Sequence, residues 1–291
     1  MKLPRLFSRP SFQGYAFVLP AFIVLFALTG YPVIYNMVLS LFKTGYGKQT
    51  FVGLANYLKA FTSIGFLEVV KNTLIWTVAN MAIMMVLGMT AALAINRNVK
   101  GKTTFQAVLL IPWVIPFVVS GIMWAFLFHP RWGAINDILL RLRLIEEPLL
   151  VLGKPATALF GVMLAYIWKV YPFVTVLILA GLKSIPEVLY DAAAIDGADG
   201  FKSFRYVTLP ALRTILSTIL LVVGIWTFNT FDLIYVMTGG GPIYASETVA
   251  MRIYKFAFSD FRFGLSAATS LIASALLVIA SFFYLREEER D

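Results

Sequence analysis

The chain has 291 residues, of which 60% are hydrophobic and 13% are charged, and its formal net charge is +9. Soluble domains contain about 25% charged residues, so this composition excludes an ordinary soluble domain and predicts a protein that crosses a membrane several times. The lack of cysteine and the single histidine exclude disulfides, thiolate chemistry and a metal site built from several Cys or His ligands. We attribute the positive charge to Lys and Arg beside membrane spans, and expect no nucleic-acid partner.

Six apolar stretches approach the roughly 20 residues that a membrane-spanning helix needs. The predicted span cores are residues 15–38, 73–95, 105–127, 158–181, 212–235 and 264–284. The first stretch is too long for a signal peptide and lacks a small-residue cleavage site, so we interpret it as a retained helix. The fold class is therefore an all-α membrane protein, with one transmembrane domain at 13–285.

The orientation of the chain follows from its basic residues. Six spans place both termini on one side, and Lys and Arg are denser in the pieces on that side than in the opposite pieces. The short loop Asn96–Thr104 contains Arg97, Lys100 and Lys102 and no acidic residue. Because basic loops favour the cytoplasm, we predict that the segments 1–12 and 286–291 are cytoplasmic.

Two charged residues interrupt the predicted spans. Lys169 lies near the middle of the fourth span, and Asp232 lies near the outer end of the fifth. Charged groups inside a membrane are costly and by default mark functional sites. Three interpretations stay open: the two residues line a solute pathway, they extend toward interfacial water, or they form an ion pair.

The segment 184–210 between the fourth and fifth spans predicts two short amphipathic helices. Ser184 and Glu187 have the spacing of a capping box at the first helix. Gly197 would end that helix in a left-handed conformation, and Asp199 would cap the second helix. The segment is rich in acidic residues, which does not suit a helix lying on lipid headgroups. We therefore predict that it docks on a partner protein.

At these residues the chain resembles the EAA motif of membrane subunits of ATP-binding-cassette (ABC) importers. The residues that match the motif are Asp191, Ala192, Ala193, Asp196, Gly197, Ala198, Phe204, Leu209 and Pro210. Asp191 stands where glutamate is usual, which keeps the charge. Phe51–Tyr57 and Thr238–Pro242 resemble elements of carbohydrate importers of the maltose and glycerol-3-phosphate type, on the side of the subunit pair that carries the Phe-Val-Gly-Leu phrase.

The resemblance implies a type I ABC importer permease fold in a prokaryotic inner membrane, with a cytoplasmic coupling loop that seats on an ATPase subunit. It also implies the partners: a second homologous permease subunit, two ATPase subunits and an extracytoplasmic solute-binding protein. The chain contains no Gly-x-x-x-x-Gly-Lys-Ser/Thr phosphate-binding loop. We therefore expect ATP and Mg to bind the ATPase subunits, and we expect no enzyme activity from this chain alone.

The same resemblance aligns parts of the fourth and fifth spans with residues that face the sugar in maltose-type subunits. The candidate pathway residues are Lys169, Val170, Phe173, Trp226, Thr227, Thr230 and Asp232. Such a set suits a sugar, whose apolar faces stack on aromatic rings and whose hydroxyls need polar partners. If Lys169 lines the pathway, it predicts a solute with an anionic group.

Two other classes of protein compete with the importer. A secondary transporter often contains internal repeats and needs coupling carboxylates, but no repeat is evident and the first, second, third and sixth spans lack carboxylates. A membrane-embedded enzyme needs paired carboxylates or an activated nucleophile, and the sequence offers few such groups. The importer permease is the preferred interpretation.

Overall fold

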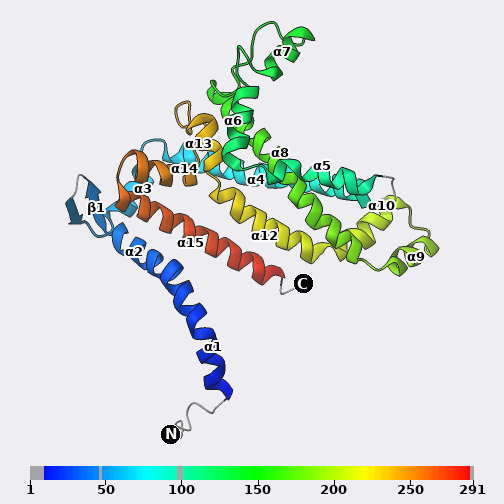
Figure 1. Ribbon diagram of the computed structural model, residues 1–291, viewed down its shortest axis with the longest axis horizontal. Helices are drawn as coiled ribbons and strands as arrows, with labels where there is room; N and C mark the ends of the chain where they lie inside the picture. Colours follow the sequence, from blue (N-terminus) through cyan, green and yellow to red (C-terminus); the bar gives the residue numbers. More distant parts are fainter. Residues whose placement is uncertain (1–9, 46–47, 97–100, 289–291) are drawn as a thin grey trace. The chain divides into compact units, whose positions relative to one another are not determined.

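The computed structural model describes residues 10–45, 48–96 and 101–288 of the chain (Figure 1). Arg97 and Lys100 of the predicted basic loop lie outside these residues, as do most of the predicted N-terminal segment and the end of the tail. Contacts divide the chain into two compact units, which we describe separately. The first is Met1–Ser63 with Lys255–Ala273, and the second is Ile64–Tyr254 with Ser274–Asp291. The predicted domain boundaries stay a prediction.

The part of the chain that the structure describes contains four to six candidate spans, against the six predicted from the sequence. Four helical stretches are long and apolar enough to cross a membrane, and two further helix pairs meet the same criterion if each bent pair is one span. The four stretches are Phe17–Ser40, Phe66–Asn96, Pro155–Ser184 and Phe263–Arg286. Helices α1 (Pro10–Leu25) and α2 (Tyr31–Ser40) contribute the first, with the π-helical turn η1 (Phe26–Gly30) between them. The other three correspond to α4 (Phe66–Asn96), α8 (Pro155–Ser184) and α15 (Phe263–Glu288).

Two predicted spans differ from the continuous runs expected from hydropathy. The predicted span 105–127 consists of α5 (Lys102–Val114) and α6 (Phe117–Leu127), whose axes differ by 92°. Pro116 between them has no N–H to continue the helix and restricts the residue before it. The predicted span 212–235 corresponds to α12 (Arg213–Asn229), and the chain then breaks before α13 (Asp232–Thr238).

The first unit also contains strands, which the all-α prediction lacked. Strands β1 (Phe42–Gly45) and β2 (Lys48–Phe51) pair antiparallel, with Phe42 opposite Phe51. Helix α3 (Ala55–Thr62) follows, and the Asn56 side-chain amide donates to the carbonyls of Ser40 and Phe42 at 2.8 and 2.9 Å. The unit is completed by the π-helical turn η3 (Lys255–Ser259) and the start of α15.

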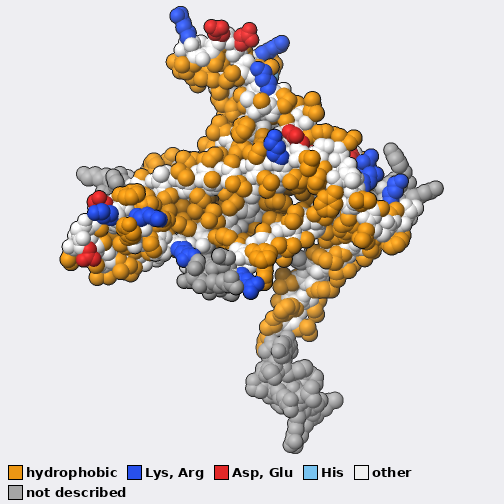
Figure 2. All heavy atoms as spheres, turned by 180° about the vertical axis from the view of Figure 1, so that it is seen from behind, with side chains coloured by type: hydrophobic (Ala, Val, Ile, Leu, Met, Phe, Trp, Pro, Cys, Tyr) orange, Lys and Arg blue, Asp and Glu red, His pale blue; other side chains and the backbone are white. Residues whose placement is uncertain are grey.

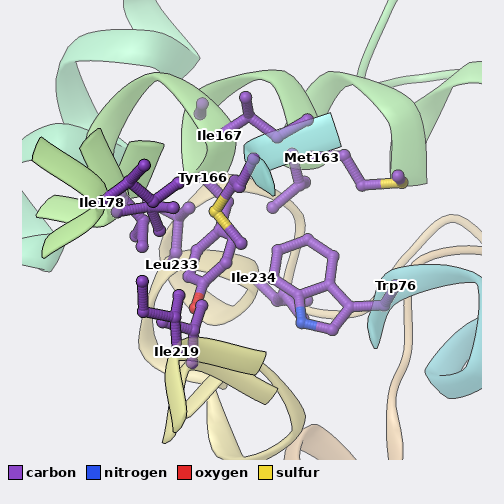
Figure 3. Close-up of a cluster of buried hydrophobic side chains, with 14 of the residues drawn as sticks. Trp76, Met163, Tyr166, Ile167, Ile178, Ile219, Leu233 and Ile234 are labelled. Carbon is purple, nitrogen blue, oxygen red and sulfur yellow. The ribbon is translucent and has the colours of Figure 1, made fainter. Parts of the chain in front are cut away.

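The second unit is built around α8. This helix packs against α4, α5, α6, α12 and α13, and its contact with α4 is the most extensive. Figure 3 shows Trp76 of α4 among Tyr166 and aliphatic side chains of α8, α12 and α13. Glycine lets the helices approach closely, because a Cβ on Gly88 of α4 would lie 2.7 Å from Val174 of α8. This core fixes the relative positions of the helices that carry the candidate site.

The remaining helices of the second unit lie outside the predicted span cores. They are α7 (Ala134–Arg141), α9 (Glu187–Ile195), α10 (Gly200–Ser203), α11 (Leu209–Ala211) and α14 (Val249–Tyr254). Hydrophobic side chains cover most of the face shown in Figure 2, and charged side chains gather in a few places. An exposed apolar surface of this extent suits contact with lipid or protein.

Candidate functional site

The predicted docking segment folds as two short helical pieces. Its first piece, α9, starts after Pro186, and no side chain caps it. The predicted capping box is therefore wrong. Helix α8 continues to Ser184, so the Ser184 hydroxyl donates to the carbonyl of Gly181 at 2.8 Å instead.

The end of α9 confirms the predicted glycine stop. Gly197 has a φ of +77°, which glycine adopts without steric cost. Its N–H donates to the carbonyl of Ala194 at 3.1 Å, and the N–H of Ala198 donates to the carbonyl of Ala193 at 2.9 Å. These two bonds form a Schellman motif, which satisfies carbonyls at the helix end.

The second piece begins at the predicted cap. The Asp199 carboxylate accepts a hydrogen bond from the N–H of Lys202 at 2.7 Å. Helix α10 continues into the π-helical turn η2 (Phe204–Thr208) and α11, and this run meets α12 at an angle of 64°. The Tyr190 hydroxyl lies 3.0 Å from the Thr208 hydroxyl and ties the two pieces together. We call residues 187–211 the hinged helix pair.

The hinged helix pair exposes large apolar side chains. Ile195 is 87% exposed, and Phe201 and Tyr206 are each 75% exposed. Large apolar side chains exposed on a short segment outside the predicted spans are compatible with a surface that a partner covers. The hinged helix pair contains every residue of the motif: Asp191, Ala192, Ala193, Asp196, Gly197, Ala198, Phe204, Leu209 and Pro210. Their role in ATPase coupling stays a prediction.

Lys169 is buried in the middle of α8, with only 3% of its surface exposed. Its ammonium donates to the carbonyls of Pro112 at 3.4 Å, of Trp113 at 3.1 Å and of Ile115. It also lies 4.5 Å from the centroid of the Phe117 ring. All four partners lie at or beside the break between α5 and α6, and we call residues 112–117 the elbow.

An ion pair between Lys169 and Asp232, one of the three interpretations left open by the sequence, is absent from the part of the chain that the structure describes. Asp232 is the first residue of α13 and is half-buried. Its carboxylate accepts a hydrogen bond from the N–H of Leu233 at 3.0 Å. A carboxylate is favourable there because the N-terminus of a helix carries partial positive charge.

Three candidate pathway residues lie in the packed interior. Thr227 is fully buried, and its hydroxyl donates to the carbonyl of Val223 and lies 3.1 Å from the Tyr166 hydroxyl. Thr230 is 8% exposed and donates to the carbonyl of Trp226 at 2.8 Å. Val170 belongs to the hydrophobic core. Tyr166, which links the two threonines and which the sequence did not single out, is a central group of this interior (Figure 3).

The other two candidates, Phe173 and Trp226, belong to an aromatic ladder that joins three helices. Trp113 of α5 stacks on Phe173 of α8, with ring centroids 5.1 Å apart and planes 11° apart. Phe173 in turn lies 5.4 Å from Trp226 of α12. Both indoles are exposed, Trp113 by 42% and Trp226 by 48%. Two prolines near Trp113, Pro112 and Pro116, are the sequence signal of a break inside this predicted span.

Comparison with known proteins identifies one matching family model. Its description is "Binding-protein-dependent transport system inner membrane component", and it matches residues 84–286. A similar curated protein is the trehalose/maltose transport system permease protein MalF of Thermococcus litoralis. It is 34% identical over 275 residues, which cover 94% of this chain and 92% of the relative.

Two further relatives and one solved structure are also similar over most of their length. The sulfoquinovosyl glycerol transport system permease protein SmoG of Agrobacterium fabrum is 34% identical, with 92% of this chain and 87% of the relative covered. The sn-glycerol-3-phosphate transport system permease protein UgpA of the same organism is 33% identical, with 83% and 82% covered. A bacterial ABC transporter involved in the import of alginate superimposes with a TM-score of 0.84 over 95% of this chain and 94% of that chain, at 22% identity. This last likeness shows the shared fold.

Proposed function

The chain belongs to the family of binding-protein-dependent transport system inner membrane components, and we propose that it forms half of the translocation pathway of an ATP-driven importer for a sugar or sugar derivative. It is a multi-pass inner-membrane protein of a family of transport permeases, not of enzymes. This family membership does not favour a secondary transporter. The proposed solute class rests on relatives named for trehalose/maltose, sulfoquinovosyl glycerol and sn-glycerol-3-phosphate transport.

The main support for coupling to an ATPase subunit is the hinged helix pair. It lies between α8 and α12, holds the motif residues, and exposes apolar side chains such as Ile195 and Phe201. In our proposal these side chains dock on an ATPase subunit, which holds ATP and Mg and performs the hydrolysis. The complete importer then contains two ATPase subunits, a second homologous permease subunit and an extracytoplasmic solute-binding protein. Both termini of this chain face the cytoplasm.

The structure offers a direct mechanical connection from the hinged helix pair to the aromatic ladder. At one end, two residues, Ile185 and Pro186, separate α8 from α9. At the other end, Leu212 is fully buried, and a Cβ on Gly181 of α8 would lie 2.8 Å from it. Because α8 and α12 are pinned together at this point, movement of the docked pair would shift both helices. These helices carry Phe173 and Trp226, the two ladder residues predicted to face the solute.

A transport assay tests the proposal. The complex would be reconstituted in proteoliposomes with its ATPase subunits and binding protein, and offered radiolabelled trehalose, maltose, sulfoquinovosyl glycerol and sn-glycerol 3-phosphate. We expect uptake of at least one of these solutes. This uptake should require the binding protein, and it should require ATP on the side of the membrane that carries the ATPase subunits. Solute uptake by this chain alone, driven by an ion gradient, would overturn the proposal.

A further inference from the structure

The elbow leaves backbone carbonyls without helical partners. Helix α5 ends at Val114, and the chain turns through 92° into α6. The carbonyl of Pro112 would normally accept from the residue four positions later, but that residue is Pro116, which has no N–H. The carbonyls of Trp113 and Ile115 likewise lie at the helix end, beyond the reach of regular helical bonds. Because the elbow lies inside a predicted span, lipid cannot satisfy such groups and they need partners within the protein or its cavity.

Lys169 supplies the missing donors. An ammonium has three N–H bonds and no acceptor, and the three carbonyl partners of Lys169 are those of Pro112, Trp113 and Ile115. The positive charge also faces the C-terminal end of α5, where the helix dipole is negative, and the face of the Phe117 ring. Every donor of the buried ammonium is thus directed at the elbow.

The same arrangement fixes Trp113 at two points on α8. Lys169 holds the backbone of Trp113 by donating a hydrogen bond to its carbonyl, and Phe173 holds the indole ring of Trp113 by stacking on it. Lys169 and Phe173 are four residues apart on α8 and so lie on one face. From this geometry we infer that Lys169 is a positioning residue: it clamps the elbow and thereby holds the Trp113 indole in the aromatic ladder that faces the solute. The inference deepens the proposed function and rests on it for the solute.

The clamp gives a different account of Lys169 from the sequence prediction of an anion-binding group. If the ammonium bound an anionic solute, it would have to leave the three carbonyls. In the clamp, the lysine affects neutral and anionic solutes alike, because it acts through Trp113. The two accounts therefore differ in what Lys169→Met would do to the elbow itself.

A distance measurement reads the elbow directly. The chain has no cysteine, so Val108→Cys on α5 and Ile122→Cys on α6, which are 58% and 59% exposed, can carry one pair of nitroxide spin labels. In the assembled complex we expect a single narrow distance distribution, which Lys169→Met broadens at least twofold. Phe117→Leu removes only the ring that the ammonium contacts, and we expect it to broaden the distance distribution less than Lys169→Met does. This variant is measured instead if the Lys169→Met complex fails to assemble. Lys154→Met is the matched control, because Lys154 is exposed at the start of the same helix.

Transport kinetics test whether Lys169 acts through Trp113. With any solute of the panel above, we expect Lys169→Met and Trp113→Leu each to raise the KM of uptake about tenfold, and the double variant to be no worse than Lys169→Met alone. An unchanged distance distribution in Lys169→Met, with multiplicative KM effects in the double variant, would overturn the clamp in favour of direct solute binding. Because the distance measurement needs no solute, a parent complex that takes up none of the four solutes would count against the proposed sugar function only.

Discussion

The hinged helix pair and the elbow are both breaks in helical backbone, but they obtain their hydrogen-bond partners in different ways. At the hinge, Gly197 closes a local Schellman motif and Asp199 caps the next helix three residues away. At the elbow, the carbonyls depend on Lys169, more than 50 positions along the chain. The hinge lies outside the predicted spans, whereas the elbow lies inside the predicted span 105–127. A break in water therefore needs only local partners, whereas a break inside a membrane needs a donor from another helix.

The largest expected effect comes from forcing the hinge out of its conformation. Gly197→Pro removes the N–H that donates to Ala194 and cannot adopt a φ of +77°. A misplaced proline costs about 3 kcal/mol or more, so we expect transport to fall about 100-fold or more while the chain still inserts in the membrane. Gly200→Pro is the matched control, because Gly200 is the first residue of α10, where proline is tolerated. Normal uptake by Gly197→Pro would remove the hinge from the coupling mechanism.

Charge reversal on the first helix of the pair is expected to have the next largest effect. Asp191 is exposed on α9. In the proposed contact with the ATPase subunit its side chain is an anion, and Asp191→Lys would replace this anion with a cation. Loss of a charged interface contact costs about 2–5 kcal/mol, so we expect at least a tenfold loss of coupled transport and of ATPase subunit that co-purifies. Asp191→Glu should retain both. Parental amounts of bound ATPase in Asp191→Lys would contradict the docking role.

The aromatic ladder should show a smaller effect that is limited to solute affinity. Trp226→Ala removes one exposed ring that contacts Phe173. An aromatic stacking contact contributes about 0.5–1.5 kcal/mol, so we expect the KM of uptake to rise about two- to tenfold with little change in maximal rate. Phe160→Ala, which removes an exposed ring elsewhere on α8, is the control. Equal effects of the two changes would indicate that Trp226 acts only through packing.

The smallest effect is expected at the local cap of the second helix. Asp199→Ala removes the carboxylate that accepts from Lys202, and a lost N-cap costs about 1 kcal/mol. We expect the amides of residues 200–203 to exchange with solvent about fivefold faster, and transport to change by about twofold or less. Asp199→Asn retains an acceptor oxygen and should exchange at the parental rate. An effect as large as that of Gly197→Pro would show that the hinge does not depend mainly on the glycine.

The two breaks also differ in how far they could be predicted. The stop at Gly197 and the cap at Asp199 were predicted from their residue types and spacing, and the structure confirms both. The capping box at Ser184 was wrong because α8 continues through that residue. Hydropathy predicted the third span as one run, since apolar content does not report a change of direction. Pro112 and Pro116 are a sequence signal of the break that the span prediction did not use, and they do not identify the residue that stabilises it.

By itself, the sequence determined the membrane class and the form of the hinge, because hydropathy and short-range hydrogen bonding depend on neighbouring residues. The partners of Lys169 at the elbow depended on contacts between residues far apart in the sequence. Only the tertiary structure shows that the buried charge of Lys169 is matched by carbonyls of another helix. The physical reason is that a buried ammonium must find acceptors wherever the packing of the helices places them.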